Sequence, residues 1–349
     1  MSVMYVTDQG ASLHKSQNRL YVKKNGEVIQ WVHHFNIEQV VIFGNINITT
    51  SCIAFLLEKG IDTVFLTVYG KYRGRLLTQW GKNIELRKLQ FSKLSDNAFK
   101  LAQSRIIIKA KIKNEMAVLR KNNYIIRDIK ITEVIRRLKS SLSRTERAED
   151  LDALMGYEGD AARIYFSVFN KLIRPPEFHI EKRTRRPPKD PFNALLSFGY
   201  ALLANEVQQA VNITGLDPYL GSLHSMKYGR PSLVLDLMEE FRPLIIDRLV
   251  IKLINQKRIR FSHFFISKEN LDDFDADEET EYEREDMPVR LTHEGIKTFI
   301  VSLKSYLSKE EFYPSEEKNL AYRDIIRRQT RLFIKCLKGE ADYQPYVYE

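Results

Sequence analysis

Residues 212–249 read NITGLDPYLGSLHSMKYGRPSLVLDLMEEFRPLIIDRL, a glycine- and proline-rich loop that leads into an apolar helix. The loop contains His224, and the first turns of the helix carry Asp236, Glu239 and Glu240. Two carboxylates three positions apart lie on one helical face and repel each other unless a cation or an arginine lies between them. A histidine in a loop that can fold back over the helix start adds a nitrogen ligand that divalent metals accept. The stretch indicates a metal site, and a solvated helix face beside a loop histidine is the alternative.

The composition is that of an ordinary folded protein. The chain has 349 residues, a length sufficient for two domains. Hydrophobic residues make up 44% and charged residues 29%, which excludes a disordered chain. No apolar run approaches the ~18 residues that cross a bilayer, and the N-terminus lacks a signal-peptide core, so we expect a cytoplasmic protein without a membrane partner. Cys52 and Cys336 lie far apart in apolar settings, which excludes a disulfide framework and a thiolate metal cluster.

The charge is unevenly distributed along the chain. The net charge is +10, and residues 71–147 contain 21 Lys and Arg against 6 Asp and Glu. Residues 272–286 reverse the balance, with ten acids and one arginine, and are predicted to form a loop. An excess of one sign over 77 residues (71 to 147) fits a surface that follows phosphates, whereas soluble helix faces usually mix both signs. The distribution therefore predicts a nucleic-acid partner.

The first part of the chain reads as strands. Short runs of alternating or continuous apolar residues are separated by turn signals, among them Asn25-Gly26, which predicts a hairpin. Residues 50–59 are the one expected helix, closed by Gly60, and the glycines that follow residue 66 are expected to break up the chain. No cluster of side chains suited to catalysis occurs here, so we assign this segment to assembly.

From about residue 84 the apolar spacing changes to the 3.6-residue period of helices. The predicted class is α+β: a small N-terminal β-strand-rich domain, residues 1–83, followed by a larger all-α catalytic domain, residues 84–349. The predicted helices are 97–122, 131–142, 145–173 (capped by Thr145), 192–211, 234–254 (kinked at Pro243), 291–307 and 320–337.

Two segments of the basic region are the predicted contacts to DNA phosphates. The first is the face of helix 97–122 that we expect to be exposed, and the second is the proline-rich connector EKRTRRPPKDP at residues 181–191. Their basic residues are Arg105, Lys109, Lys113, Arg120 and Lys121 on the helix, and Arg183, Arg185 and Arg186 in the connector.

Glu158 falls on the apolar face of the predicted helix 145–173. A lone ionised carboxylate in a core is too costly to keep, so Glu158 must be neutralised, paired or bound to metal, and pairing with Arg163 or a distant arginine is the structural alternative. Gly156 and Gly159 flank it and suggest that another backbone or a substrate approaches closely. Together with the loop histidine and the acidic pair, Glu158 completes an oxygen and nitrogen ligand set that suits Mn²⁺ or Mg²⁺ better than zinc.

Three separated motifs also carry a resemblance to a known family. In order and spacing they resemble the CRISPR-associated endonuclease/integrase family "Cas-one", and the layout of strands followed by helices agrees over nearly the whole chain. The motifs are GYEGDAAR at 156–163, NALLSFGY at 193–200, and GLDP at 215–218 followed by Gly221, His224 and GRPSLVLDLMEEFRP at 229–243.

The resemblance implies a homodimeric, metal-dependent DNA nuclease and integrase that inserts double-stranded fragments as new spacers into a CRISPR array. It implies a smaller partner, "Cas-two", and an attacking water or DNA 3′-hydroxyl activated by metal. The implied metal ligands are Glu158, His224 and Glu239. Asp236 either shares the metal or supports it, and Arg163 and Arg242 lie beside the ligands or face phosphate. The alternatives are a non-catalytic nucleic-acid scaffold and a general repair nuclease for branched DNA.

Overall fold

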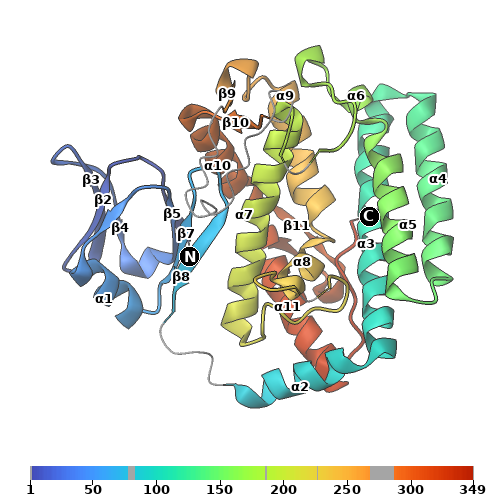
Figure 1. The fold of residues 1–349 in the computed structure, drawn as a ribbon, viewed down its shortest axis with the longest axis horizontal. Coiled ribbons are helices and arrows are strands. Elements are labelled where there is room, and N and C mark those ends of the chain that lie inside the picture. The colour runs from blue at the N-terminus through green and yellow to red at the C-terminus, as the bar shows by residue number, and fades with distance from the viewer. Residues whose placement is uncertain (1, 78–82, 185–186, 226, 268–286, 349) are drawn as a thin grey trace. The chain divides into compact units, whose positions relative to one another are not determined.

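The computed structural model describes residues 2–77, 83–184, 187–225, 227–267 and 287–348. The chain divides into two compact units, one formed by residues 1–82 with 263–304 and the other by residues 83–262 with 305–349 (Figure 1). The first is rich in strands and the second is mainly helical, which confirms the α+β class. The sequence predicted one division, after residue 83, and did not anticipate that residues 263–304 belong to the first unit.

The first unit contains two four-stranded sheets and helix α1. One sheet has the order β1-β5-β7-β8, in which β1, β5 and β7 are parallel and β8 is antiparallel to β7. The other has the order β4-β3-β2-β6. The bounds are β1 (Ser2–Val6), β2 (Ser12–Ser16), β3 (Arg19–Lys24), β4 (Glu27–His33), β5 (Ile37–Phe43), β6 (Asn47–Ile48), α1 (Thr50–Glu58), β7 (Asp62–Leu66) and β8 (Tyr72–Leu76).

Turn residues set the register of the second sheet. Asn25 and Gly26 join β3 to β4 with φ of 51° and 84°, as a tight hairpin turn requires, so the predicted hairpin is confirmed. The prediction that glycines break up the chain after residue 66 is confirmed at Gly70, which lies in the turn before β8 with φ of 87°, and is wrong at Gly74, which lies inside β8 opposite Phe65; Gly81 lies outside the described residues. β8 is at the edge of its sheet, and no atom lies within 4 Å of the position that a Cβ of Gly74 would take.

Residues 263–304 belong to the first unit and contact its N-terminal part through an arginine–tyrosine pair and a lysine–aspartate pair. The antiparallel strands β9 (Phe264–Ile266) and β10 (Val289–Leu291) precede α10 (His293–Leu307). Arg290 places its guanidinium 4.2 Å from the ring centroid of Tyr69, and Lys297 pairs with Asp8 at 2.8 Å. The acidic segment 272–286, predicted to be a loop, lies outside the described residues.

The second unit is built from helices and one added β-hairpin, β11–β12, which the all-α expectation did not include. Figure 1 shows α3, α4 and α5 side by side, and their contacts agree. The bounds are α2 (Ile84–Ser95), α3 (Asn97–Ile126), α4 (Ile129–Glu146), α5 (Leu151–Phe166), α6 (Phe169–Leu172), α7 (Pro191–Thr214), α8 (Ser232–Met238), a π-helical turn (Arg242–Asp247), α9 (Arg248–Asn255), β11 (Glu310–Tyr313), β12 (Lys318–Ala321) and α11 (Tyr322–Lys338).

Aspartates begin the principal helices of this unit. Asp96, Asp128, Asp150 and Asp190 each accept a hydrogen bond from a backbone N–H in the first turn of α3, α4, α5 and α7. The predicted helix 145–173 is therefore wrong at its start. Thr145 lies inside α4, where its hydroxyl donates to the carbonyl of Leu142, and Asp150 begins α5 instead.

The predicted helix 234–254 is three segments in the structure. α8 ends at Met238, a π-helical turn follows, and α9 begins at Arg248. Pro243 lies in the π-helical turn, and a proline has no N–H to donate to the preceding turn, which removes a hydrogen bond that a regular helix needs. A π-helical turn often marks a functional position, and this one lies directly after Glu239.

Of the helices in the described residues, none combines the length and the apolar content that crossing a membrane requires. The core of the second unit is dense in aromatic side chains: Tyr165, Phe169 and Phe192 are fully buried, and the ring of Phe169 packs edge-on against the other two. This aromatic cluster fixes α5 against α7, and α5 carries Glu158.

Candidate active site

Glu158 is paired across the helix bundle rather than along its own helix. Its side chain is 15% exposed, and its carboxylate accepts a hydrogen bond from the ammonium of Lys111 on α3. The sequence-based alternative of a pair with Arg163 is wrong: Arg163 is 71% exposed and bonds to Asp160 at 2.6 Å. The requirement that Glu158 must have a partner is therefore met by a lysine from another helix.

Gly156 and Gly159 lie beside Glu158 with open space around them. No atom lies within 4 Å of where a Cβ would stand on either glycine. The expectation that another part of the backbone packs closely there is wrong for the described residues. The two glycines leave open space on the helix surface next to the carboxylate. Close approach by a substrate there stays a prediction.

Glu239 lies at the end of α8 among positive charges. It is 3% exposed, with Oε2 2.8 Å from Lys111 Nζ and Oε1 2.6 Å from Arg242 Nη1. His224 Nε2 is 3.9 Å from the same Oε1. Burial alone would raise the pKa of Glu239, but Arg242 and Lys111 outweigh it and hold that pKa well below its usual range. Glu239 is therefore ionised at neutral pH.

Asp236 holds the histidine loop and not the cation. It is fully buried, with Oδ2 2.5 Å from the backbone nitrogen of Ser222 and 3.0 Å from that of Leu223. Oδ1 accepts from the backbone of His224 at 3.0 Å and from its ring Nδ1 at 2.7 Å. Because a carboxylate only accepts, Nδ1 donates, and Nε2 is the ring nitrogen that faces Glu239. Asp236 and Glu239 therefore have separate partners in the structure, and a metal shared by both stays a prediction.

Gly221 makes this loop possible. A Cβ at Gly221 would lie 2.5 Å from Asp236 Oδ2 and 2.7 Å from the carbonyl carbon of Ser232. Any larger residue would therefore push the loop off the carboxylate that orients His224. The glycine of the sequence motif serves close packing of backbone against side chain at this point.

Lys111 links two of the three predicted ligands, and the third, His224, lies beside one of them. Glu158 and Glu239 share the ammonium of Lys111, and His224 faces Glu239. In the described parts of the chain, no three His, Cys, Asp or Glu side chains are spaced to hold one ion as they stand, because Lys111 and Arg242 occupy the carboxylate oxygens. Two carboxylates and an imidazole nonetheless form a donor set that fits Mg²⁺ or Mn²⁺ once the ammonium moves.

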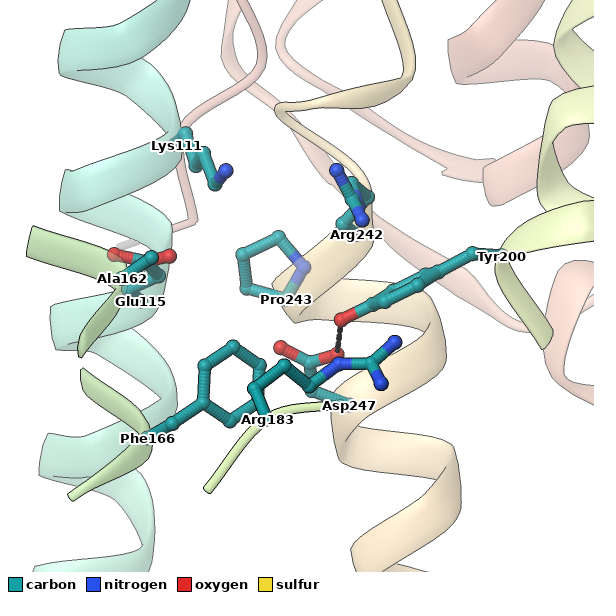
Figure 2. Close-up of a pocket in the computed structure, with 9 residues that line it drawn as sticks. All are labelled: Lys111, Glu115, Ala162, Phe166, Arg183, Tyr200, Arg242, Pro243 and Asp247. Carbon is teal, nitrogen blue, oxygen red and sulfur yellow. Dashed lines mark hydrogen bonds between the residues drawn. The ribbon is translucent and has the colours of Figure 1, made fainter. Parts of the chain in front are cut away.

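A small pocket continues from these charges toward the helix core (Figure 2). Asp247 accepts from the hydroxyl of Tyr200 at 2.5 Å and from that of Tyr165 at 3.0 Å, and burial raises the pKa of Asp247 to about 6. The Arg242 guanidinium stacks on the Tyr200 ring at 4.1 Å. The lining residues are Lys111, Glu115, Ala162, Phe166, Arg183, Tyr200, Arg242, Pro243 and Asp247.

The predicted DNA-contact residues are divided by the packing of α3. Arg105 donates to the carbonyl of Ala148, and Lys109 pairs with Glu146 at 2.6 Å, so neither lies on the fully exposed face that the sequence suggested. Lys113, Arg120 and Lys121 are exposed, and Lys121 Nζ bonds to the Tyr348 hydroxyl at 2.9 Å.

The connector gives a different result from α3. Arg183 turns inward, donates to Asn193 Oδ1 at 2.7 Å and lines the pocket of Figure 2. Arg185 and Arg186 lie outside the described residues. Of the connector arginines predicted to contact phosphate, the described one therefore reaches the same pocket as Arg242.

Lys111, Glu115 and Asp247 belong to this cluster, and our sequence analysis did not identify them. Lys111 and Glu115 are one helical turn apart, within a stretch of α3 whose neighbouring residues are almost all buried. Lys111 and Glu115 are charged residues on an apolar helix face, which is the same sequence signal that identified Glu158. The contacts that Lys111 makes with Glu158 and Glu239, and Asp247 with Tyr165 and Tyr200, join residues far apart in the chain and carry no local sequence signal.

Comparison with known proteins agrees with this geometry. The family model described as CRISPR associated protein Cas1 matches residues 4–274. CRISPR-associated endonuclease Cas1 3 of Thermus thermophilus is 37% identical over 99% of this chain and 97% of its own length. A Leptospira interrogans CRISPR-associated endonuclease Cas1 is also 37% identical, over 76% of this chain and 100% of its own length.

Solved structures share the fold. A Cas1 protein from Thermotoga maritima superimposes with a TM-score of 0.79 at 26% identity, and the match covers 100% of both chains. A casposase bound to its integration product gives a TM-score of 0.83 at 22% identity over 100% of this chain. The relatives of this chain are named as endonucleases, a class of nucleic-acid enzyme. The chain belongs to the Cas1 family, named Cas-one in the sequence analysis.

The role of Asp236 gives a prediction. Replacing Asp236 by Asn places an amide NH₂ against the backbone donors of the loop, so we expect the free energy of unfolding to fall by about 1–3 kcal/mol. Because His224 also loses its orienting partner, Mn²⁺ affinity measured by titration calorimetry is expected to fall about 10- to 100-fold. Asp160→Asn is the matched control, since Asp160 pairs only with half- or fully exposed arginines on the surface. Unchanged Mn²⁺ affinity in Asp236→Asn would remove Asp236 from the site.

Proposed function

We propose that this chain is the divalent-metal-dependent DNA endonuclease and integrase of CRISPR adaptation. It would insert short double-stranded fragments as new spacers by attack of a DNA 3′-hydroxyl on phosphodiesters of the array. The observation that carries the proposal is that Glu158 and Glu239 share the ammonium of Lys111 while the oriented imidazole of His224 faces Glu239, in a Cas1-family chain. Relatives named as endonucleases support it, as does the shared fold of a casposase.

Each residue of the cluster has a definable part in that reaction. Glu158, His224 and Glu239 would hold Mg²⁺ or Mn²⁺, which when bound supplies Lewis acidity for the phosphate and the attacking hydroxyl. Asp236 fixes the tautomer and orientation of His224. Arg242, held by Glu239 and by the face of Tyr200, adds a positioned positive charge for a transferring phosphate.

Positioning accounts for the rest of the proposed chemistry. The attacking group in this scheme is water or a DNA 3′-hydroxyl, so the protein forms no covalent intermediate and contributes orientation and charge. Buried ionised groups are costly unless each has a partner, and a cluster this dense is seldom kept for stability alone. This cost favours an enzyme over the alternative of a non-catalytic nucleic-acid scaffold.

The chemistry can be tested on the three proposed ligands separately. Glu158→Gln, His224→Ala and Glu239→Gln are each expected to reduce Mn²⁺-dependent DNA cleavage and integration to the level measured with a chelator, because each removes a ligand. Asp160→Asn on α5 is the control that should retain activity. A variant with the wild-type rate and the same metal would strike that residue from the ligand set.

The same assay separates the alternatives. A donor fragment that lacks its 3′-hydroxyl should not be integrated, and undiminished integration would contradict the proposed attack. Scaffold binding would survive the chelator, whereas the chemistry would not. A repair nuclease for branched DNA would cut whether or not the substrate contains a repeat–spacer target. A repeat–spacer array next to the gene would also favour CRISPR adaptation over that alternative.

The proposed partners are double-stranded DNA, a second copy of this chain and a smaller Cas-two protein. One chain of a solved Cas6-RT-Cas1–Cas2 complex shares the fold over 99% of this chain and 36% of its own length, with a TM-score of 0.81 at 23% identity. Integration of both fragment ends needs two sites, which a symmetric dimer supplies. We propose that the first unit mediates the pairing, since edge strand β4 exposes Val28, Ile29 and Trp31. Sedimentation at the monomer mass, or a dimer unaffected by Trp31→Glu, would contradict this.

The exposed lysines and arginines of α3 give a prediction on DNA binding. Lys113→Gln and Arg120→Gln should each flatten the slope of log K against log[salt] by ~0.9, because each phosphate contact releases about one counterion. Lys109→Gln is the control, as Lys109 already pairs with Glu146. Binding isotherms at several salt concentrations measure the slope. An unchanged slope in both variants would place the DNA surface elsewhere.

A further inference from the structure

Lys111 occupies the centre of the proposed metal site. The residue is 6% exposed, and its ammonium contacts the carboxylate of Glu158 and lies 2.8 Å from Glu239 Oε2. Lys111 is thus a charged, buried cation held by two of the three proposed ligands.

A divalent ion and this ammonium compete for the same oxygens. Ions such as Mn²⁺ bind carboxylate oxygens at about 2.0–2.4 Å, which brings them to the atoms that Lys111 now contacts. Two positive centres that share the same pair of oxygens repel each other strongly in a buried setting. The three ligands can therefore close on an ion only after the ammonium has moved away.

Glu115 offers the ammonium a second position. It lies one turn after Lys111 on α3, and both side chains line the pocket in Figure 2. Glu115 is 2% exposed, and its Oε2 has no hydrogen-bond partner among the described residues. Positions i and i+4 of a helix face each other, so a lysine can reach a glutamate there by changing its side-chain torsions.

The state of Glu115 explains why the lysine rests where it does. Burial raises the pKa of Glu115 to about 8, with Lys111 as the main opposing influence, so at neutral pH its carboxyl is largely protonated. Glu158 and Glu239 then offer the stronger attraction to the ammonium. Asp247 and Arg242 also line this pocket, but Asp247 is held by two tyrosine hydroxyls and Arg242 by Glu239.

We propose that Lys111 is a resident cation that a divalent metal displaces, and that the displaced ammonium pairs with Glu115. The inference rests on the proposed metal site and adds a role for two residues that are not ligands. In the metal-free protein Lys111 neutralises the two carboxylates and keeps α3 and α5 together with the end of α8. On metal binding the Lys111 side chain turns toward Glu115, which releases its proton to solvent as it pairs with the ammonium, and the two carboxylates become available to the ion.

The test compares Mn²⁺ binding and thermal unfolding in two variants. Lys111→Met keeps the length of the side chain but removes the charge. Without metal its Tm is expected to fall, because two buried carboxylates lose their cation. Its Mn²⁺ affinity is expected to rise at least about tenfold, since no ammonium has to be displaced, and Mn²⁺ should then raise its Tm by more than it raises the wild-type Tm.

Glu115→Gln tests the second position independently and does not require Lys111→Met to fold. Its metal-free Tm should match the wild type, because the Glu115 carboxyl has an oxygen without a hydrogen-bond partner to lose. Its Mn²⁺ affinity should fall several-fold, because the displaced lysine finds no carboxylate. Lys113→Met, an exposed change on the same helix, is the control that should alter neither quantity.

The outcomes separate the exchange from the metal site itself. Wild-type or weaker Mn²⁺ affinity in Lys111→Met would show that the lysine assists the ion, and would overturn the exchange. Wild-type or tighter affinity in Glu115→Gln would overturn it equally. Wild-type Mn²⁺ affinity in Glu158→Gln would instead remove the metal site, and the exchange with it.

Discussion

The second unit depends on one buried charge cluster in which Lys111 joins Glu158 and Glu239. The three side chains come from α3, α5 and the end of α8, so the cluster fixes the relative positions of these elements. Removing one partner would leave a buried charge without compensation, which is far more costly than losing a surface pair. Arg242 completes the balance by binding the second oxygen of Glu239. The site and the fold around it are thus maintained by the same contacts.

Two acids one helical turn apart have different partners. Asp236 lies in α8 and Glu239 is its C-terminal capping residue, with helical backbone dihedrals of φ −60° and ψ −38°. Asp236 is left to bind the backbone and ring of His224, while Glu239 faces the cation. The tight loop that this requires explains the glycine at position 221. The partners around each carboxylate, rather than the spacing of the two acids, therefore distinguish their surroundings.

Local patterns predicted the elements, and non-local contacts decided the rest. Alternating residues located the strands of the first unit, and the hairpin at Asn25-Gly26 followed from turn chemistry alone. Burial identified Glu158 from a helical stripe, and His224 stood out as a loop histidine near an acidic pair, whereas the choice of Glu239 within that pair needed the family resemblance. Thr145 and Asp150 are both good helix-capping residues, and the packing of α4 against α5 chose the second. The pairing of Lys111 with a glutamate 47 residues away (158 − 111) has no signal in sequence spacing.

The account is tested most directly by locating the ion. Anomalous diffraction from crystals of the full chain grown with Mn²⁺ should show one peak at about 2.0–2.4 Å from oxygens of Glu158 and Glu239 and from the His224 ring nitrogen. In the electron-density map of the same crystals, the Lys111 side chain should have left the two carboxylates and turned along α3 toward Glu115. A peak bound by other residues, or Lys111 still between Glu158 and Glu239 in crystals that hold the ion, would contradict the account.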